Sequence, residues 1–205
     1  MKALIFDMGG VLVDLDPQAC RNAFKERLGF DEIDVLLDPC HQKGIIGDME
    51  EGLVSGDEFR DYVVARSRPG TRREDVDEAF NTILVGIEPY KVEMLRSLAE
   101  KYDIYMLSNN NPVALKRARQ MFEDAGFSMD RDFTRCYISY QMKMIKPSAG
   151  FFKAVMKDIG LPPSQMLFID DSQTNVRASM DAGLPAVWYR PGDDLAALIE
   201  KIITP

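Results

Sequence analysis

Short apolar runs alternate with amphipathic helical patterns in the second half of the chain. Apolar runs of strand length lie at residues 2–6, 104–108, 136–140, 166–170 and 186–189. Between them, apolar side chains recur at helical spacing in segments that begin near Pro112, Ser148 and Thr174, and each segment ends at a glycine. The order after about residue 90 is therefore strand and helix in alternation, which predicts a parallel sheet with helices on both faces.

Residues 15–89 have a different pattern, because they offer helical periodicity without a convincing strand. Residues 73–84, for example, carry apolar side chains at helical intervals. We therefore expect residues 1–14 and 90–205 to form the α/β core, with residues 15–89 as a helical cap over the carboxyl edge of the sheet. A plain helical layer is the alternative that the pattern leaves open.

Composition excludes several classes of protein. The chain has 205 residues, of which 46% are hydrophobic, so it can bury a full core. Its formal net charge is -8, without a run of lysines or arginines, which argues against a nucleic-acid partner. No apolar stretch has the length of a membrane span, and the three cysteines, Cys20, Cys40 and Cys136, are widely spaced, as in reduced cytoplasmic proteins. We expect a cytoplasmic protein without a membrane or nucleic-acid partner, and the sequence identifies no protein partner.

Residues whose side chains can react or bind a ligand follow four of the predicted strands. They are Asp7 after the first strand, Ser108 and Asn109 after the second, Lys146 beyond the third, and Asp170 with Asp171 after the fourth. In an open parallel sheet, ligands bind beyond the carboxyl ends of the strands, so these side chains can converge although they are far apart in sequence.

This set of residue types describes a site for phosphoryl transfer. A carboxylate nucleophile, Asp7, can form an aspartyl phosphate. The acids alone would repel a phosphate, so we expect a hard divalent cation, Mg²⁺, held by Asp7, the acidic pair and a backbone carbonyl. Lys146 and Ser108 would hold the remaining phosphate oxygens, with Lys146 also compensating the charge on Asp7.

Four segments resemble motifs of the haloacid dehalogenase (HAD) superfamily, in the right order. They are "FDMGGVLVD", "LSNNN", "KP" and "IDDSQTN". The resemblance implies a Rossmann-like core with a helical cap inserted just after the first motif. It also implies that Asp7 is the nucleophile, that Ser108 and Asn109 bind phosphate, that Lys146 stabilises charge, and that Asp170 or Asp171 binds Mg²⁺. The first motif reads DxGxV and is most similar to the branch that includes sugar-phosphatase-like proteins and the N-terminal domains of some epoxide hydrolases.

The chain departs from the family pattern at Gly9. HAD phosphatases usually carry a second aspartate at this position, which protonates the leaving oxygen and then activates water. The backbone carbonyl of Gly9 can still be a metal ligand, because that contact needs no side chain. Asp14 and His41 are candidates to replace the missing acid, although a turn acid and a surface imidazole are their ordinary interpretations.

Three functions remain open at this level. A Mg²⁺-dependent phosphatase of a small phosphorylated metabolite, with a sugar phosphate favoured, fits the motifs best. A 2-haloacid dehalogenase is the second, although relatives of that type usually have an aromatic residue at the position of Gly9 and an arginine near the site. The third is a HAD fold without turnover that binds a phosphorylated metabolite or a partner protein. His41, Tyr62 and Arg66 are candidates to face the site from the cap.

Overall fold

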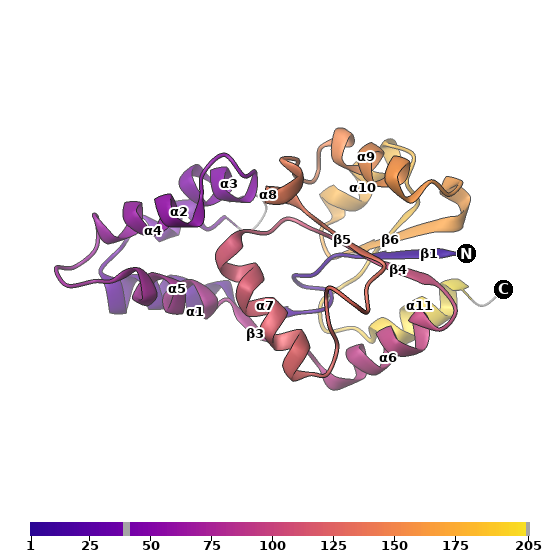
Figure 1. The fold of residues 1–205 in the computed structure, drawn as a ribbon, viewed down its shortest axis with the longest axis horizontal. Helices are drawn as coiled ribbons and strands as arrows, with labels where there is room; N and C mark the ends of the chain where they lie inside the picture. The colour runs from indigo at the N-terminus through magenta and orange to yellow at the C-terminus, as the bar shows by residue number, and fades with distance from the viewer. Residues whose placement is uncertain (39–41, 204–205) are drawn as a thin grey trace.

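The computed structural model of the protein describes residues 1–38 and 42–203 (Figure 1). The strands are β1 (Ala3–Phe6), β2 (Asp14–Leu15), β3 (Leu84–Gly86), β4 (Asp103–Ser108), β5 (Arg135–Ile138), β6 (Met166–Asp170) and β7 (Ala186–Trp188). The helices are α1 (Pro17–Ala23), the π-helix η1 (Phe24–Leu28), α2 (Ile33–Leu36), α3 (Gly44–Glu50), α4 (Gly56–Val64), α5 (Arg73–Asn81), α6 (Pro89–Ala99), α7 (Pro112–Asp124), α8 (Ser139–Met142), α9 (Ala149–Ile159), the 3₁₀ turn η2 (Pro163–Gln165), α10 (Gln173–Asp181) and α11 (Leu195–Ile203). Among the described residues, no helix is both long enough and apolar enough to cross a bilayer.

The main sheet has five parallel strands in the order β5-β4-β1-β6-β7. Strand β1 lies at its centre, where Ile5 is in register with Tyr105 of β4 and with Phe168 of β6. Because both neighbours run parallel to β1, the strand ends that carry Asp7, Ser108 and Asp170 meet at one edge. The predicted α/β fold with a parallel sheet is therefore confirmed.

Helices cover both faces of this sheet, which explains why its strands are apolar without alternation. Leu4 and Phe6 of β1 pack into a core shared with α6, α7 and α11, whereas Ala3 and Ile5 pack on the opposite face against α9. Figure 1 shows α9 and α10 above the sheet and α6 and α11 below it.

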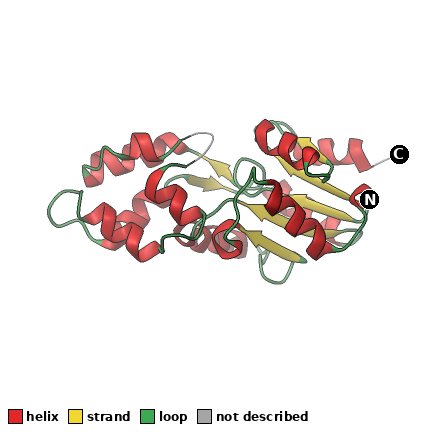
Figure 2. Ribbon diagram, turned by 90° about the horizontal axis from the view of Figure 1, so that it is seen from above, coloured by secondary structure: helices red, strands yellow, loops and turns green. Residues whose placement is uncertain are grey.

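The helices α1 to α5 are set apart from the sheet, beyond the carboxyl ends of its strands (Figure 2). Aromatic rings form the centre of this group, with Phe80 in edge-to-face contact with both Phe24 and Phe59. The predicted helical insertion after the first strand is therefore present. Its limits at residues 15 and 89 stay a prediction.

Two predicted elements need correction. The insertion contains a short strand, since α5 ends at Asn81 and Leu84–Gly86 forms β3, which pairs antiparallel with β2. A strand of three residues is too short to give a periodic signal. The predicted strand 136–140 ends earlier, at Ile138, because helix α8 begins at Ser139. Ser139 is buried, and its hydroxyl accepts from the N–H of Asn110 at 2.9 Å.

Candidate active site

Asp7 follows β1 at the centre of the sheet edge and is 8% exposed. Its backbone N–H donates to the carbonyl of Ile169 at 2.9 Å, which ties it to β6. Its Oδ1 accepts from the N–H of Met8 at 2.7 Å and lies 2.9 Å from Nζ of Lys146. Burial raises the pKa of Asp7 well above its usual range, and the ammonium of Lys146 opposes that shift.

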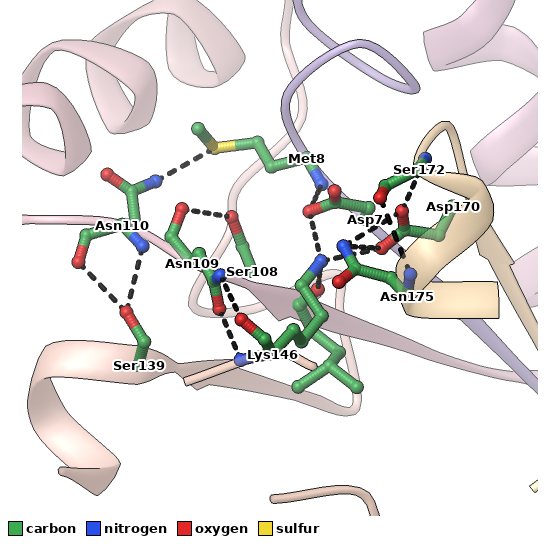
Figure 3. Close-up of polar contacts among 11 residues, drawn as sticks. Asp7, Met8, Ser108, Asn109, Asn110, Ser139, Lys146, Asp170, Ser172 and Asn175 are labelled. Carbon is green, nitrogen blue, oxygen red and sulfur yellow. Dashed lines mark hydrogen bonds and ion pairs between the residues drawn. The ribbon is translucent and has the colours of Figure 1, made fainter. Parts of the chain in front are cut away.

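Lys146 holds the two buried carboxylates together. Its Nζ lies 2.9 Å from Oδ1 of Asp7 and 2.8 Å from Oδ2 of Asp170, and it donates to the carbonyl of Leu107 at 3.0 Å. These contacts use all three N–H donors of the ammonium, as Figure 3 shows. Burial favours the neutral amine, but the two carboxylates outweigh it and raise the pKa of Lys146. The side chain therefore stays positively charged.

The two acids that follow β6 have different surroundings. Asp170 is fully buried, and its carboxylate accepts from the N–H of Ser172 at 2.7 Å and from Nδ2 of Asn175, which lies 3.1 Å from both of its oxygens. Asp171 is half-buried, and burial, followed by the charge of Asp170, raises the pKa of its carboxyl to about 6. Asp170 is thus held rigidly, while Asp171 lies nearer to solvent.

Asp7, Asp170 and Asp171 form a group whose carboxylate oxygens, one from each residue, lie within 4.8 Å of one another. Three carboxylates beside a single lysine leave an excess of negative charge, and hard oxygen donors are what Mg²⁺ prefers. The donor set therefore fits the predicted Mg²⁺ site. The carbonyl of Gly9 as a further ligand stays a prediction.

Ser108 and Asn109 lie at the end of β4, next to Lys146. The hydroxyl of Ser108 is buried and donates weakly to the carbonyl of Asn109 at 3.3 Å. The amide of Asn109 forms two bonds with the backbone of Lys146, donating to its carbonyl at 2.9 Å and accepting from its N–H at 2.8 Å (Figure 3). The side chain of Asn109 thus positions the loop that carries Lys146.

A cavity of about 160 Å³ lies beside Gly9, between the sheet edge and the cap helices. It is lined by Met8, Gly9, Leu15, Leu37, Gln42, Glu50, Phe80, Ile83, Leu84, Asn109, Asn110, Asn111, Ala114 and Ile145. The side chain of Leu15 fills the space that a side chain at position 9 would need, because a Cβ there would lie 2.9 Å from its Cδ1. Among the described residues, the buried Oε1 atom of Gln42 has no hydrogen-bond partner.

The remaining candidates from the sequence lie elsewhere. Asp14 pairs with Nζ of Lys91 at 2.9 Å. The hydroxyl of Tyr62 donates to Oε2 of Glu32 at 2.7 Å, and the guanidinium of Arg66 lies over the Tyr62 ring. In the part of the chain that the structure describes, the cavity wall includes neither Asp14 nor Tyr62 and Arg66. His41 lies outside the described residues.

Sequence reasoning missed Glu50, Gln42 and Asn111 as residues of this site. Asn111 stands in the "LSNNN" segment, so its neighbours were a signal that could have identified it. Glu50 and Gln42 come from the cap, where neither a motif nor a strand end marks them. Their place at the cavity depends on how the cap folds back onto the core.

Comparison with known proteins identifies the family. A model of the haloacid dehalogenase-like hydrolases matches residues 1–183. A D-ribitol-5-phosphate phosphatase from Bacteroides thetaiotaomicron is 31% identical over 195 residues, which cover 95% of this chain and 94% of that protein.

Solved structures agree with this assignment. A HAD family enzyme from Bacteroides thetaiotaomicron, in complex with magnesium and inorganic phosphate, has a TM-score of 0.89 at 36% identity, covering 97% of this chain and 98% of that one. A HAD-like family hydrolase from Porphyromonas gingivalis has a TM-score of 0.91 at 30% identity, covering 100% of this chain and 98% of that one. The superfamily inferred from the four motifs is confirmed, and the chain belongs to the haloacid dehalogenase-like hydrolases.

Proposed function

We propose that the protein is a Mg²⁺-dependent phosphatase that hydrolyses a small sugar or polyol phosphate through an aspartyl phosphate on Asp7. The observation that carries the proposal is the position of Lys146, whose Nζ lies within 2.9 Å of both Asp7 and Asp170, beside a third carboxylate. A metal site, a buried carboxylate and a lysine at one sheet edge are the parts that phosphoryl transfer needs.

Each residue has a defined task in this reaction. Mg²⁺ held by Asp7, Asp170 and Asp171 supplies the positive charge that lets a phosphate approach three acids. One oxygen of Asp7 attacks phosphorus, while Lys146 keeps the other oxygen in place and favours the ionised carboxylate. The hydroxyl of Ser108 and the backbone N–H of Asn109 bind the phosphate oxygens.

The substrate class follows from the cavity and from a relative. The cavity of about 160 Å³ has room for a short carbon chain, and amide groups from Gln42, Asn110 and Asn111 line it beside apolar residues such as Phe80. Hydroxyl groups on a short carbon chain suit such a mixed wall. The D-ribitol-5-phosphate phosphatase that is 31% identical to this chain supports a phosphorylated polyol of similar size.

The two other functions have less support. A haloacid dehalogenase has no need of the three-carboxylate group, and the described residues of the cavity wall include no arginine to bind the carboxylate of a haloacid. A binding module without turnover has no need of a buried carboxylate paired with a lysine. We therefore retain the phosphatase as the function to test.

The decisive experiment measures phosphate release with Mg²⁺ over a panel of sugar, polyol and acyl phosphates, in parallel with an Asp7→Asn variant. We expect activity in the wild type and its loss in the variant, with no halide release from 2-chloropropionate. Activity that persists in Asp7→Asn contradicts the role of Asp7. Thermal stabilisation by a panel compound without phosphate release would favour the binding module.

The cytoplasmic location and the place of the chain in the DxGxV branch also stay proposals. The first is supported by the free thiols of Cys20 and Cys136, and the second by the first motif itself.

A further inference from the structure

Glu50 brings a carboxyl group to the side of the site where position 9 lacks one. It stands at the end of α3 and lines the same cavity as Gly9 and Asn109. Among the described residues of the cavity wall, Glu50 is the only one with an acidic side chain. A proton donor for the leaving oxygen must stand near the nucleophile, and the cavity connects Glu50 with the residues that follow Asp7.

A close backbone contact fixes this end of α3 on the core. Gly52 follows the helix with a φ of 72°, and a Cβ there would lie 2.3 Å from the carbonyl oxygen of Tyr140 in α8. A glycine is therefore needed for the two segments to approach so closely. The contact places Glu50 against the core rather than in solvent.

Asn111 lies in the wall of the same cavity as Glu50. The Oδ1 atom of Asn111 accepts from the N–H groups of Val113 at 3.1 Å and Ala114 at 2.9 Å, as the N-cap of α7. This cap fixes the direction of the amide and leaves its NH₂ group available as a donor to Glu50, whose pKa Asn111 lowers.

The surroundings of Glu50 favour its protonated form near neutral pH. Burial raises the pKa of this carboxyl to about 8, although the charge of Lys146 and the hydrogen bond from Asn111 act in the opposite direction. Among the described residues, Lys146 is the charged group that acts on this carboxyl. A carboxylic acid with such a pKa can give up and regain a proton during turnover.

We propose that Glu50 is the general acid and base of the reaction, in place of the side chain that Gly9 lacks. The proposal rests on the phosphatase function above. In the first half, an oxygen of Asp7 bonds to phosphorus, the bond from phosphorus to the leaving oxygen breaks, and that oxygen takes the proton of Glu50. In the second half, the Glu50 carboxylate takes a proton from water as the water oxygen attacks phosphorus. The bond from phosphorus to Asp7 then breaks, which releases inorganic phosphate.

The test uses Glu50→Gln, which keeps the size and the hydrogen-bonding capacity of the side chain but cannot transfer a proton. Two substrates are compared with Mg²⁺: 4-nitrophenyl phosphate, whose leaving group needs no acid, and the sugar or polyol phosphate that the wild type hydrolyses fastest. With the sugar or polyol phosphate, kcat should fall by about 10²- to 10⁴-fold, the usual contribution of a general acid or base.

The aryl phosphate separates the two halves of the reaction. In Glu50→Gln, nitrophenolate should leave in a rapid burst that approaches one equivalent per enzyme, followed by a slow steady state. The burst is expected because attack by water still lacks its base, so phosphate accumulates on Asp7. With the sugar or polyol phosphate, whose leaving oxygen needs a proton, the wild type should lose kcat/KM at alkaline pH as Glu50 ionises, and Glu50→Gln should not show this loss.

Glu51→Gln is the matched control, because it makes the same change one residue further along the chain at an exposed position. It should keep wild-type kinetics. Two results with Glu50→Gln would overturn the proposal. An increase in KM at unchanged kcat would leave Glu50 as a binding residue, and a kcat equal to that of the wild type, without a burst, would leave it as a binding or a structural residue. If instead the wild type releases no phosphate from any compound, it is the phosphatase function that fails. If Glu50→Gln folds poorly, Glu50→Asp replaces it in the test. Activity of Glu50→Asp equal to that of the wild type on both substrates also overturns the proposal.

Discussion

The carboxylate of Asp171 occupies the space that a side chain at position 10 would need. A Cβ at Gly10 would lie 2.2 Å from Oδ2 of Asp171, and the φ of Gly10 is 73°, which L-residues rarely adopt. The first turn after Asp7 and the acidic pair after β6 are therefore packed against each other. Gly10 is needed for the three carboxylates to meet.

Replacement of Gly10 by alanine should weaken Mg²⁺ binding. The new methyl group must displace the Asp171 carboxylate, and disturbing a group that orients a metal ligand typically costs 10- to 100-fold in affinity, so we expect a loss of about that size. Gly192→Ala is the matched control, because Gly192 has a φ of 91° and no atom of the described residues lies within 4 Å of the added Cβ. Calorimetric Mg²⁺ titration of both variants checks the prediction. Equal Mg²⁺ affinities of the two variants would contradict the prediction that a methyl group at position 10 disturbs the Asp171 carboxylate.

Lys146→Met should destabilise the metal-free protein. Its removal leaves the buried carboxylates of Asp7 and Asp170 without their shared cation, and breaking a buried ion pair from one side costs about 3–5 kcal/mol. Urea unfolding without Mg²⁺ measures this loss. Lys153→Met, at an exposed position of α9, is the control and should change the free energy of unfolding by less than about 0.5 kcal/mol. A similar small change in both variants would argue against a structural role for Lys146.

The stability of the metal-free protein should depend on pH through Asp171. The pKa of its carboxyl is 3.8 in the unfolded chain and about 6 in the folded protein. Between these pH values the folded state keeps a proton that the unfolded state releases. Stability from this group is therefore highest below pH 3.8 and falls as pH rises to about 6. The pKa of Asp7 is also raised, so the stability of the metal-free protein should decrease further at higher pH.

Mg²⁺ must displace these protons, so its stabilising effect should increase with pH. We expect the increase in Tm at a constant concentration of free Mg²⁺ to be larger at pH 8 than at pH 5. In Asp171→Asn the difference between the two pH values should shrink. Melting curves with equal Mg²⁺ shifts at both pH values would contradict the assignment of the carboxylates as ligands.

An aspartate at position 9 should compensate for the loss of Glu50, provided that there is room for it. Gly9 does not have a positive φ, but its Cβ would lie 2.9 Å from the Cδ1 atom of Leu15. We therefore expect Gly9→Asp with Leu15→Ala to recover activity in the Glu50→Gln background on the order of tenfold on substrates with poor leaving groups. Gly9→Asp alone should recover less. No gain in either variant, measured by phosphate release from folded protein, contradicts the view that position 9 reaches the leaving oxygen.

The sheet and most of its catalytic edge could be predicted, because strands buried on both faces of a parallel sheet have continuous apolar sequences. Four of the five runs are followed by residues that can react or bind a ligand, and the carboxyl ends of parallel strands meet at one edge. Asp7, Lys146 and Asp170 could therefore be placed together from the sequence. The short β3 could not be predicted in this way. Three residues give no period, and Leu84–Gly86 is a strand because Asp14 and Leu15 pair with it.

The sequence by itself determined the family, the fold and the group of carboxylates with its lysine, because these depend on local patterns and on a topology that such patterns specify. The tertiary structure decided what the amide of Asn109 contacts, what fills the space beside Gly9 and where Glu50 lies. Those facts depend on contacts between segments that are distant in the chain. Gly9 marked a missing side chain, and a cap helix folded onto the core supplies a carboxyl group in its neighbourhood.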